Sequence, residues 1–213
     1  MSLRFKRLLK GVVLAIAFNQ AAIAGTTIEA RLNAVHSMKA DFVQTIQDNR
    51  GKKIQQSFGS MALVRPGKFR WDTKKPIPQL IIANDSRLYI VDKDLEQVTI
   101  RALHQATGES PALLLSHENA SIEHDYVVKE ITKKGSNLSW YSLKPKAEDS
   151  PFALVEMGFA GNVLQQMSLQ DHLGHSTQIE FKHVQSNIAL SNSLFVFKKT
   201  ANMDVIDETS KRK

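Results

Sequence analysis

The chain of 213 residues has 28 Lys and Arg against 21 Asp and Glu, and it has no cysteine. Disulfides and thiol chemistry are therefore excluded. The first 24 residues contain four of the basic residues and no acidic one, so without them the net charge falls from +7 to +3. Because no run of basic residues interleaved with aromatic ones remains, nucleic acid is not an expected partner.

Residues 1–24 have the layout of a secretory signal peptide. Four basic residues precede a short apolar run at 11–18, and an A-x-A cleavage site ends at Ala24. The apolar run is too short to span a bilayer. Cleavage would place Gly25 at the new N-terminus, which offers no cysteine for lipid attachment. We expect residues 25–213 to form one exported, soluble domain.

The mature chain is predicted to be mainly β. The capping-box spacing from Thr26 to Glu29 predicts a helix at about 26–37. Its apolar stripe is Ile28, Leu32 and Val35. Alternating apolar residues bounded by turn residues predict strands in most of the rest. These strands begin at Met38 and continue at 53–64, 69–72, 79–83, 87–91, 96–103, 121–131, 138–144, 152–159, 163–169, 178–183, 194–197 and 203–206.

A second helix interrupts the strands. Ser110 and Pro111 fit its N-cap and first turn, and Leu113, Leu114 and Leu115 follow. A helix so rich in leucine must lie on apolar surface. The strands are too many for one flat layer, so the sheet must curl into a barrel-like shape or split into a sandwich. The helices would then lie in or across its mouth.

Patterns for catalysis and metal binding are weak. No cysteine and no G-x-S-x-G turn is present, so only a Ser/His/Asp site assembled from distant residues would provide a nucleophile. His172 and His175 have metal-ligand spacing, but Leu173 and Gly174 between them favour a hairpin turn. We therefore expect no enzyme activity, no metal site and no cofactor.

An apolar binding cavity is the stronger hypothesis, and Arg65 is the residue that favours it. By alternation Arg65 shares a strand face with Met61 and Leu63, just before the turn at Pro66. It is either a solvent-facing arginine at a hairpin end, or a guanidinium beneath the helices that donates hydrogen bonds to their terminal carbonyls. In the second case it would hold a lid shut. The predicted lining of the cavity has a simpler alternative, which is that the same residues only form core. These residues are Met61, Leu63, Phe69, Trp71, Leu80, Ile82, Leu88 and Ile90.

Several motifs resemble the LolA family of periplasmic carriers of outer-membrane lipoproteins. Residues 59–71 are similar to its signature, G-x-(apolar)-x-x-x-R-P-x-x-F-x-W, and residues 38–44 to its A-x-F-x-Q strand. Three later segments of this chain are also similar to segments of the family, namely 88–98, 107–114 and 195–207. The departures, at 84–86 and 198–202, fall in turns and leave the apolar positions unchanged.

The resemblance implies an unclosed antiparallel β-barrel with a lid of two to three helices. It implies a monomeric chaperone without a cofactor. The chaperone would accept triacylated lipoproteins from an inner-membrane ABC transporter, shield their acyl chains and deliver them to an outer-membrane receptor. In the family the arginine before the proline holds the lid shut, which corresponds to Arg65. The phenylalanine three residues after the proline belongs to the cavity and to exchange with the transporter, which corresponds to Phe69. The lid would comprise Ile28, Leu32, Val35, Leu113, Leu114 and Leu115.

Three other classes are weighed against the carrier. A periplasmic module that senses lipoproteins and controls an anti-sigma factor would carry a further C-terminal domain, whereas this chain ends just after its last strand. A receptor anchored in the outer membrane would need a cysteine in place of Gly25. A lipid hydrolase would need a serine nucleophile, which no motif indicates.

Overall fold

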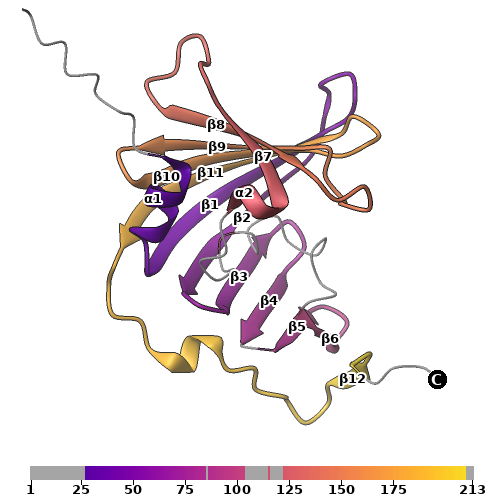
Figure 1. Ribbon diagram of the computed structural model, residues 1–213. Coiled ribbons are helices and arrows are strands. Elements are labelled where there is room, and N and C mark those ends of the chain that lie inside the picture. The colour runs from indigo at the N-terminus through magenta and orange to yellow at the C-terminus, as the bar shows by residue number, and fades with distance from the viewer. Residues whose placement is uncertain (1–26, 85, 104–114, 116–121, 210–213) are drawn as a thin grey trace, which may run out of the picture.

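The computed structural model describes residues 27–84, 86–103, 115 and 122–209. The described strands form one twelve-stranded sheet in the order β12-β6-β5-β4-β3-β2-β1-β11-β10-β9-β8-β7. Neighbouring strands are antiparallel except β12, which runs parallel to β6. Because β12 and β7 lie at opposite edges, the sheet is open, and it curls upon itself (Figure 1). The strands are β1 Ser37–Gln47, β2 Lys53–Val64, β3 Lys68–Lys75, β4 Gln79–Asn84, β5 Arg87–Asp92, β6 Gln97–Ala102, β7 Tyr126–Ile131, β8 Ser139–Pro145, β9 Leu154–Ala160, β10 Val163–Gln170, β11 Ser176–Ser186 and β12 Asp204–Asp207.

The prediction of a mainly β, unclosed antiparallel sheet is thus confirmed. Two details of the predicted elements are wrong. The segment expected as a strand at 194–197 is instead a 3-10 helix, η3 (Asn192–Phe195), which begins after Ser191 because that side chain accepts a hydrogen bond from the Ser193 backbone N–H. The strand expected at 121–131 begins as a short helix, α2 (Ile122–Asp125), and becomes β7 only at Tyr126.

The N-terminal helix α1 (Ile28–Asn33) is shorter than the predicted 26–37. Its N-cap is Thr27, whose hydroxyl oxygen accepts a hydrogen bond from the Ala30 backbone N–H at 3.2 Å, one residue later than the predicted cap. The chain leaves the helix within a few residues, because β1 already begins at Ser37 and pairs there with β2. In Figure 1 the helix lies beside β1 and β10, at one end of the curled sheet.

The inner face of the curled sheet carries the larger of two apolar clusters, to which β1 to β5, β8 to β11 and α1 contribute. At its centre Phe42 stacks on Trp71 with ring centroids 3.7 Å apart. Gly59 makes this packing possible. A Cβ on Gly59 would lie 2.6 Å from Cζ of Phe42 and closer still to the backbone oxygen of Asp72. Residue 59, the first of the stretch 59–71, must therefore be glycine, because an aromatic ring and a neighbouring strand approach its backbone too closely for any side chain.

The second cluster lies on the outer face, where the C-terminal segment covers β4 to β6. Val91, Val98 and Ile100 form its buried part, and Phe197 and Met203 of the C-terminal segment pack on them. Figure 1 shows this segment leaving β11, passing along the lower strands and ending as β12 at the far edge. Both faces of β4 and β5 are consequently covered, one by the inner cluster and one by the chain's own C-terminal segment.

Candidate functional site

Most of the predicted cavity residues lie on the inner face. Met61, Leu63, Phe69, Trp71 and Leu88 are at most 4% exposed and belong to the larger cluster. Ile90 is partly buried and packs against the same cluster. In the arrangement that the structure describes, these side chains fill the inside of the sheet as core.

Leu80 and Ile82 lie on the other face, so the prediction that they line the same cavity is wrong. The register pairs Leu80 with Val91 and Ile82 with Tyr89, and Leu80 packs on the outer cluster. It is Ile81 of the same strand that faces inward. The error has a physical reason. Residues 80–83 are all apolar, because β4 is covered on both sides, and an uninterrupted apolar run does not show which alternate set faces which side.

The predicted lid residues within the described chain also face the inner cluster. Ile28 and Leu115 are each 2% exposed, and Leu32 and Val35 pack against the cluster from α1. Leu113 and Leu114 lie outside the described residues. Apolar side chains of α1, together with Leu115, thus pack on the inner cluster.

Arg65 lies at the start of the turn after β2, next to the junction of α1 and β1. Its backbone N–H donates a hydrogen bond to the carbonyl oxygen of His36 at 2.9 Å. Its side chain is partly buried, and among the described residues its Nε has no hydrogen-bond partner. Burial lowers the pKa of this guanidinium below its ordinary value. A buried donor without an acceptor is unfavourable, so this side chain would gain from an acceptor brought close to it.

A second arginine, Arg31 of α1, is more deeply buried than Arg65 and is not among the predicted site residues. It is 8% exposed. Its Nε donates to the Tyr141 hydroxyl at 3.1 Å, its Nη2 donates to the Ser139 hydroxyl at 3.2 Å, and its Nη1 donates to the Gly161 carbonyl oxygen. The guanidinium also lies 5.8 Å from the Tyr141 ring centroid and 5.9 Å from that of Phe159. Arg31 therefore attaches α1 to β8 and to the turn between β9 and β10.

Asn187 makes a second attachment, at the C-terminal end of α1. Its side-chain amide donates to the Ala34 carbonyl oxygen at 2.8 Å, and its side-chain oxygen accepts from the His36 backbone N–H at 2.8 Å. Asn187 itself has a φ of +58°, a conformation that asparagine tolerates better than most residues. The last turn of α1 is thus satisfied by a residue that follows β11, far away in the sequence.

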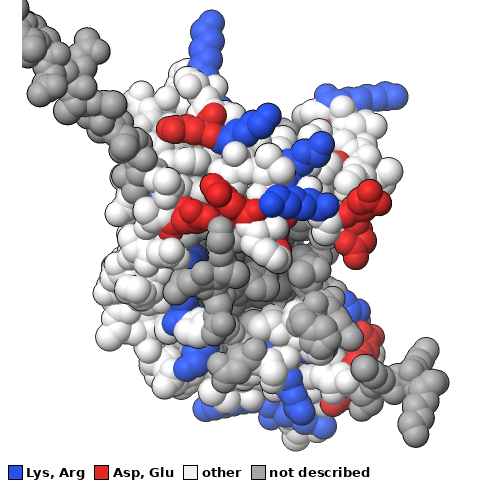
Figure 2. Space-filling view, in the orientation of Figure 1, with Lys and Arg blue, Asp and Glu red and all other residues white. Residues whose placement is uncertain are grey.

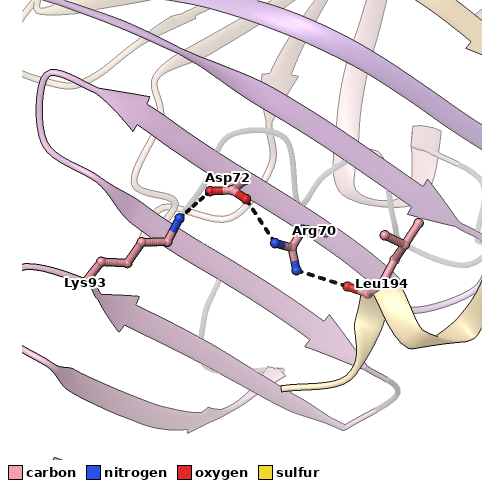
Figure 3. Close-up of polar contacts among 4 residues, drawn as sticks. All are labelled: Arg70, Asp72, Lys93 and Leu194. Carbon is pink, nitrogen blue, oxygen red and sulfur yellow. Dashed lines mark hydrogen bonds and ion pairs between the residues drawn. The ribbon is translucent and has the colours of Figure 1, made fainter. Parts of the chain in front are cut away.

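Polar contacts on the outer face attach the C-terminal segment (Figure 3). Asp72 of β3 accepts hydrogen bonds from Lys93 at 2.7 Å and from Arg70 at 2.9 Å. Arg70 also donates to the backbone oxygen of Leu194 in η3 at 3.3 Å. Burial by itself would raise the pKa of Asp72, but the hydrogen bonds from Lys93 and Arg70 outweigh it and lower that pKa below its ordinary value.

The lowered pKa of Asp72 predicts a pH-dependent contribution to stability. A carboxylate with a lowered pKa in the folded state stabilises that state above the unfolded pKa of about 3.9, and this stabilisation is lost as the pH falls through the folded value. We expect Asp72→Asn to lower the free energy of unfolding by about 1 kcal/mol at pH 7. The difference from the unchanged chain should shrink below about pH 4, as measured by urea unfolding at both pH values. An equal difference at pH 7 and pH 3 would contradict this assignment.

Charged side chains of both signs share one face of the molecule. Figure 2 shows acidic and basic side chains interleaved over the upper half of the face that it displays. Among the described residues no helix is long and apolar enough to cross a membrane. No group of three or more potential metal ligands occurs within that same part of the chain.

Comparison with known proteins identifies the family. The family of the outer membrane lipoprotein carrier protein LolA matches residues 33–198. An outer-membrane lipoprotein carrier protein of Methylobacillus flagellatus is 38% identical over 197 residues, which is 92% of this chain and 95% of the relative. The protein of the same name from Chromobacterium violaceum is 41% identical over 196 residues, covering 90% of this chain and 93% of the relative.

A solved structure with a similar fold is also found. An uncharacterised conserved protein of Thermus thermophilus superposes with a TM-score of 0.55 over 85% of this chain and 97% of its own, at 10% identity. At that identity the likeness concerns the fold alone. The sequence relatives cover nearly the whole chain at far higher identity, and with the family match they decide the assignment. The chain belongs to the LolA family of outer-membrane lipoprotein carrier proteins.

Proposed function

We propose that this protein carries lipoproteins through the periplasm by shielding their acyl chains, as the names of its relatives indicate. The observation that carries the proposal is the identity of about 40% to such carriers over nine-tenths of the chain. In this proposal residues 1–24 direct export and residues 25–213 form the carrier. An inner-membrane ABC transporter loads the carrier, and a receptor at the outer membrane unloads it.

Physical chemistry explains why such a carrier needs an apolar inner face. Each buried CH₂ group contributes about 0.8 kcal/mol, so the three acyl chains of a triacylated lipoprotein oppose transfer into water by tens of kcal/mol. The inner face of the curled sheet offers a continuous apolar surface of matching character. Hydrolysis of ATP by the transporter would supply the free energy for loading, so the carrier itself needs neither a cofactor nor a catalytic residue.

Loading requires that the inner face opens. The side chains that would become the binding surface, such as Phe69 at 0% exposure, are covered in the described structure. Acyl chains can reach them only if the groups that cover them move, and these include Ile28 of α1 and Leu115. Phe69 would then take part in exchange with the transporter only in the open form.

Arg65 is the proposed latch of the closed form. Its buried Nε, without a partner in the described chain, is a strong donor beside the α1–β1 junction. A backbone carbonyl of the lid that accepted a hydrogen bond from this Nε would favour the closed form. A stable closed form would weaken the net binding of cargo, because part of the free energy of cargo binding is used to open the lid. Weaker net binding would make release easier.

A release assay tests the proposed function. Inner-membrane vesicles that contain the lipoprotein-releasing transporter and labelled lipoprotein are incubated with ATP and residues 25–213. We expect labelled lipoprotein to appear in the supernatant together with the carrier. Vesicles without ATP, and serum albumin in place of the carrier, are the controls. Lipoprotein that stays with the vesicles to the same extent with and without the carrier would contradict the proposal.

A further inference from the structure

The inner face changes from apolar to polar along β1, β3 and β4. Phe42, Trp71 and Ile81 belong to the apolar cluster. Two residues away on each strand, the same face presents Gln44, Thr73 and Gln79, since side chains on one face recur every two residues. Gln44 and Thr73 follow the apolar residue of their strand, and Gln79 precedes Ile81 because β4 runs antiparallel to β3. The register places Thr73 opposite Gln79, next to the Trp71–Ile81 pair, and Gln44 opposite Ser57 of β2. The polar side chains therefore form a row directly beside the apolar core.

This row lines a pocket of about 200 Å³. Trp71 and Ile81 belong both to the pocket and to the apolar cluster, so the two surfaces are continuous. Ile77, which also lines the pocket, is 58% exposed and so borders on solvent. The residues that line the pocket are Gln44, Gln55, Ser57, Trp71, Thr73, Ile77, Gln79 and Ile81.

The polar groups of the pocket are neutral, and several are available to a ligand. Gln55 donates to the Ser57 hydroxyl at 3.1 Å. The side chains of Gln44, Thr73 and Gln79 make no hydrogen bond to another group of the described chain. None of the lining residues is charged, so a phosphate or carboxylate would find no counter-charge there. Amide and hydroxyl side chains instead suit ester and amide groups, because they both donate and accept hydrogen bonds.

We propose that this pocket binds the neutral ester and amide groups that join the acyl chains to the N-terminal residue of a lipoprotein. The inference rests on the proposed carrier function and adds to it a site for the linkage region. A ligand whose apolar chains lie on the inner cluster passes Trp71 and Ile81 where its polar part begins. Gln44, Thr73 and Gln79 lie just beyond that point. The polar row thereby sets how deep the acyl chains enter and directs the polypeptide towards Ile77 and solvent.

Binding of a synthetic triacylated cysteinyl lipopeptide, compared with binding of palmitate, tests the assignment. The double variant Gln44→Leu, Gln79→Leu keeps side-chain size but loses the hydrogen-bonding groups. We expect it to bind the lipopeptide about tenfold more weakly than the unchanged chain, with the affinity for palmitate unaltered. Gln56→Leu is the matched control. Gln56 neighbours the pocket residues in β2, but its amide donates to Thr45 at 3.2 Å and does not line the pocket.

A second measurement does not depend on affinity. Because the chain has no cysteine, Gln79→Cys introduces a single thiol in the pocket. We expect the lipopeptide, but not palmitate, to slow its reaction with N-ethylmaleimide, whereas the thiol of Gln56→Cys reacts equally fast in all cases. Unaltered lipopeptide affinity in the double variant would overturn the assignment of the pocket but not the carrier function. The same holds if bound lipopeptide does not protect the Gln79→Cys thiol. Failure of the unchanged chain to bind the lipopeptide at all would overturn the carrier function with it.

Discussion

Replacing Arg31 with methionine is expected to lower the free energy of unfolding by about 3 kcal/mol. Methionine preserves most of the side-chain volume, but it removes the guanidinium that donates to Tyr141, Ser139 and Gly161. Hydrogen bonds from a charged group contribute about 1.5–3 kcal/mol each and are not additive, and the three acceptors would be left partly buried. Urea unfolding measures the change, and hydrogen exchange of the α1 amides should become faster.

Two variants control for the removal of an arginine as such. Arg31→Lys keeps the charge, but its single nitrogen cannot reach the three separate acceptors that Nε, Nη1 and Nη2 of the arginine contact. An intermediate loss is therefore expected. Arg101→Met removes an arginine from a more exposed ion pair with Glu208, 2.7 Å long, and should cost less than about 1 kcal/mol. If Arg31→Met were no more destabilising than Arg101→Met, the hydrogen bonds of Arg31 would not be what holds α1 on the sheet. Asn187 and the packing of Ile28 would then provide the attachment.

Replacing Arg65 with leucine is expected to leave loading intact and to reduce delivery at least tenfold. Leucine removes the guanidinium and, with it, the hydrogen bond that the lid is proposed to accept from Arg65 in the closed form. The closed, empty form then loses stability relative to the open form, so cargo is held more tightly. A tenfold effect corresponds to about 1.4 kcal/mol, which one hydrogen bond from a charged group can supply. Transfer of labelled lipoprotein from the loaded carrier to membranes that contain the receptor measures delivery.

Arg70→Leu is the matched control for Arg65→Leu. Arg70 belongs to the strand that follows the same turn, but its side chain lies on the outer face, where it pairs with Asp72. Its loss should weaken the attachment of the C-terminal segment and leave delivery by folded protein near normal. Delivery at the unchanged rate by Arg65→Leu would exclude the latch.

The two arginines show what the sequence could and could not predict. Arg65 was found because alternation placed a charged residue on an apolar strand face. Arg31 carries the same signal in helical form, since it occupies the i+3 position of the stripe formed by Ile28, Leu32 and Val35. Its partners come from β8 and from the turn after β9, more than 100 residues away. Sequence pattern alone could mark Arg31 as unusual but could not supply the acceptors.

Local signals also decided which elements were predicted well. Strand β2 was predicted with its observed bounds, because turn residues delimit it on both sides. The C-terminal segment follows no such signal. Its 3-10 helix and its parallel pairing with β6 are stabilised by contacts such as the stacking of Phe197 on Tyr89, with ring centroids 5.0 Å apart. The polar row beside Trp71 was likewise missed, because its residues come together only through the register of four strands.

Isolation of a complex with a triacylated lipoprotein tests the central claim most directly. Residues 25–213 would be mixed with detergent-solubilised lipoprotein, the detergent removed, and the soluble fraction analysed by size-exclusion chromatography with mass measurement. The carrier function predicts a soluble one-to-one complex that forms with the triacylated protein and not with the same protein lacking its acyl chains. Aggregated lipoprotein and free monomeric carrier, eluting separately, would contradict it.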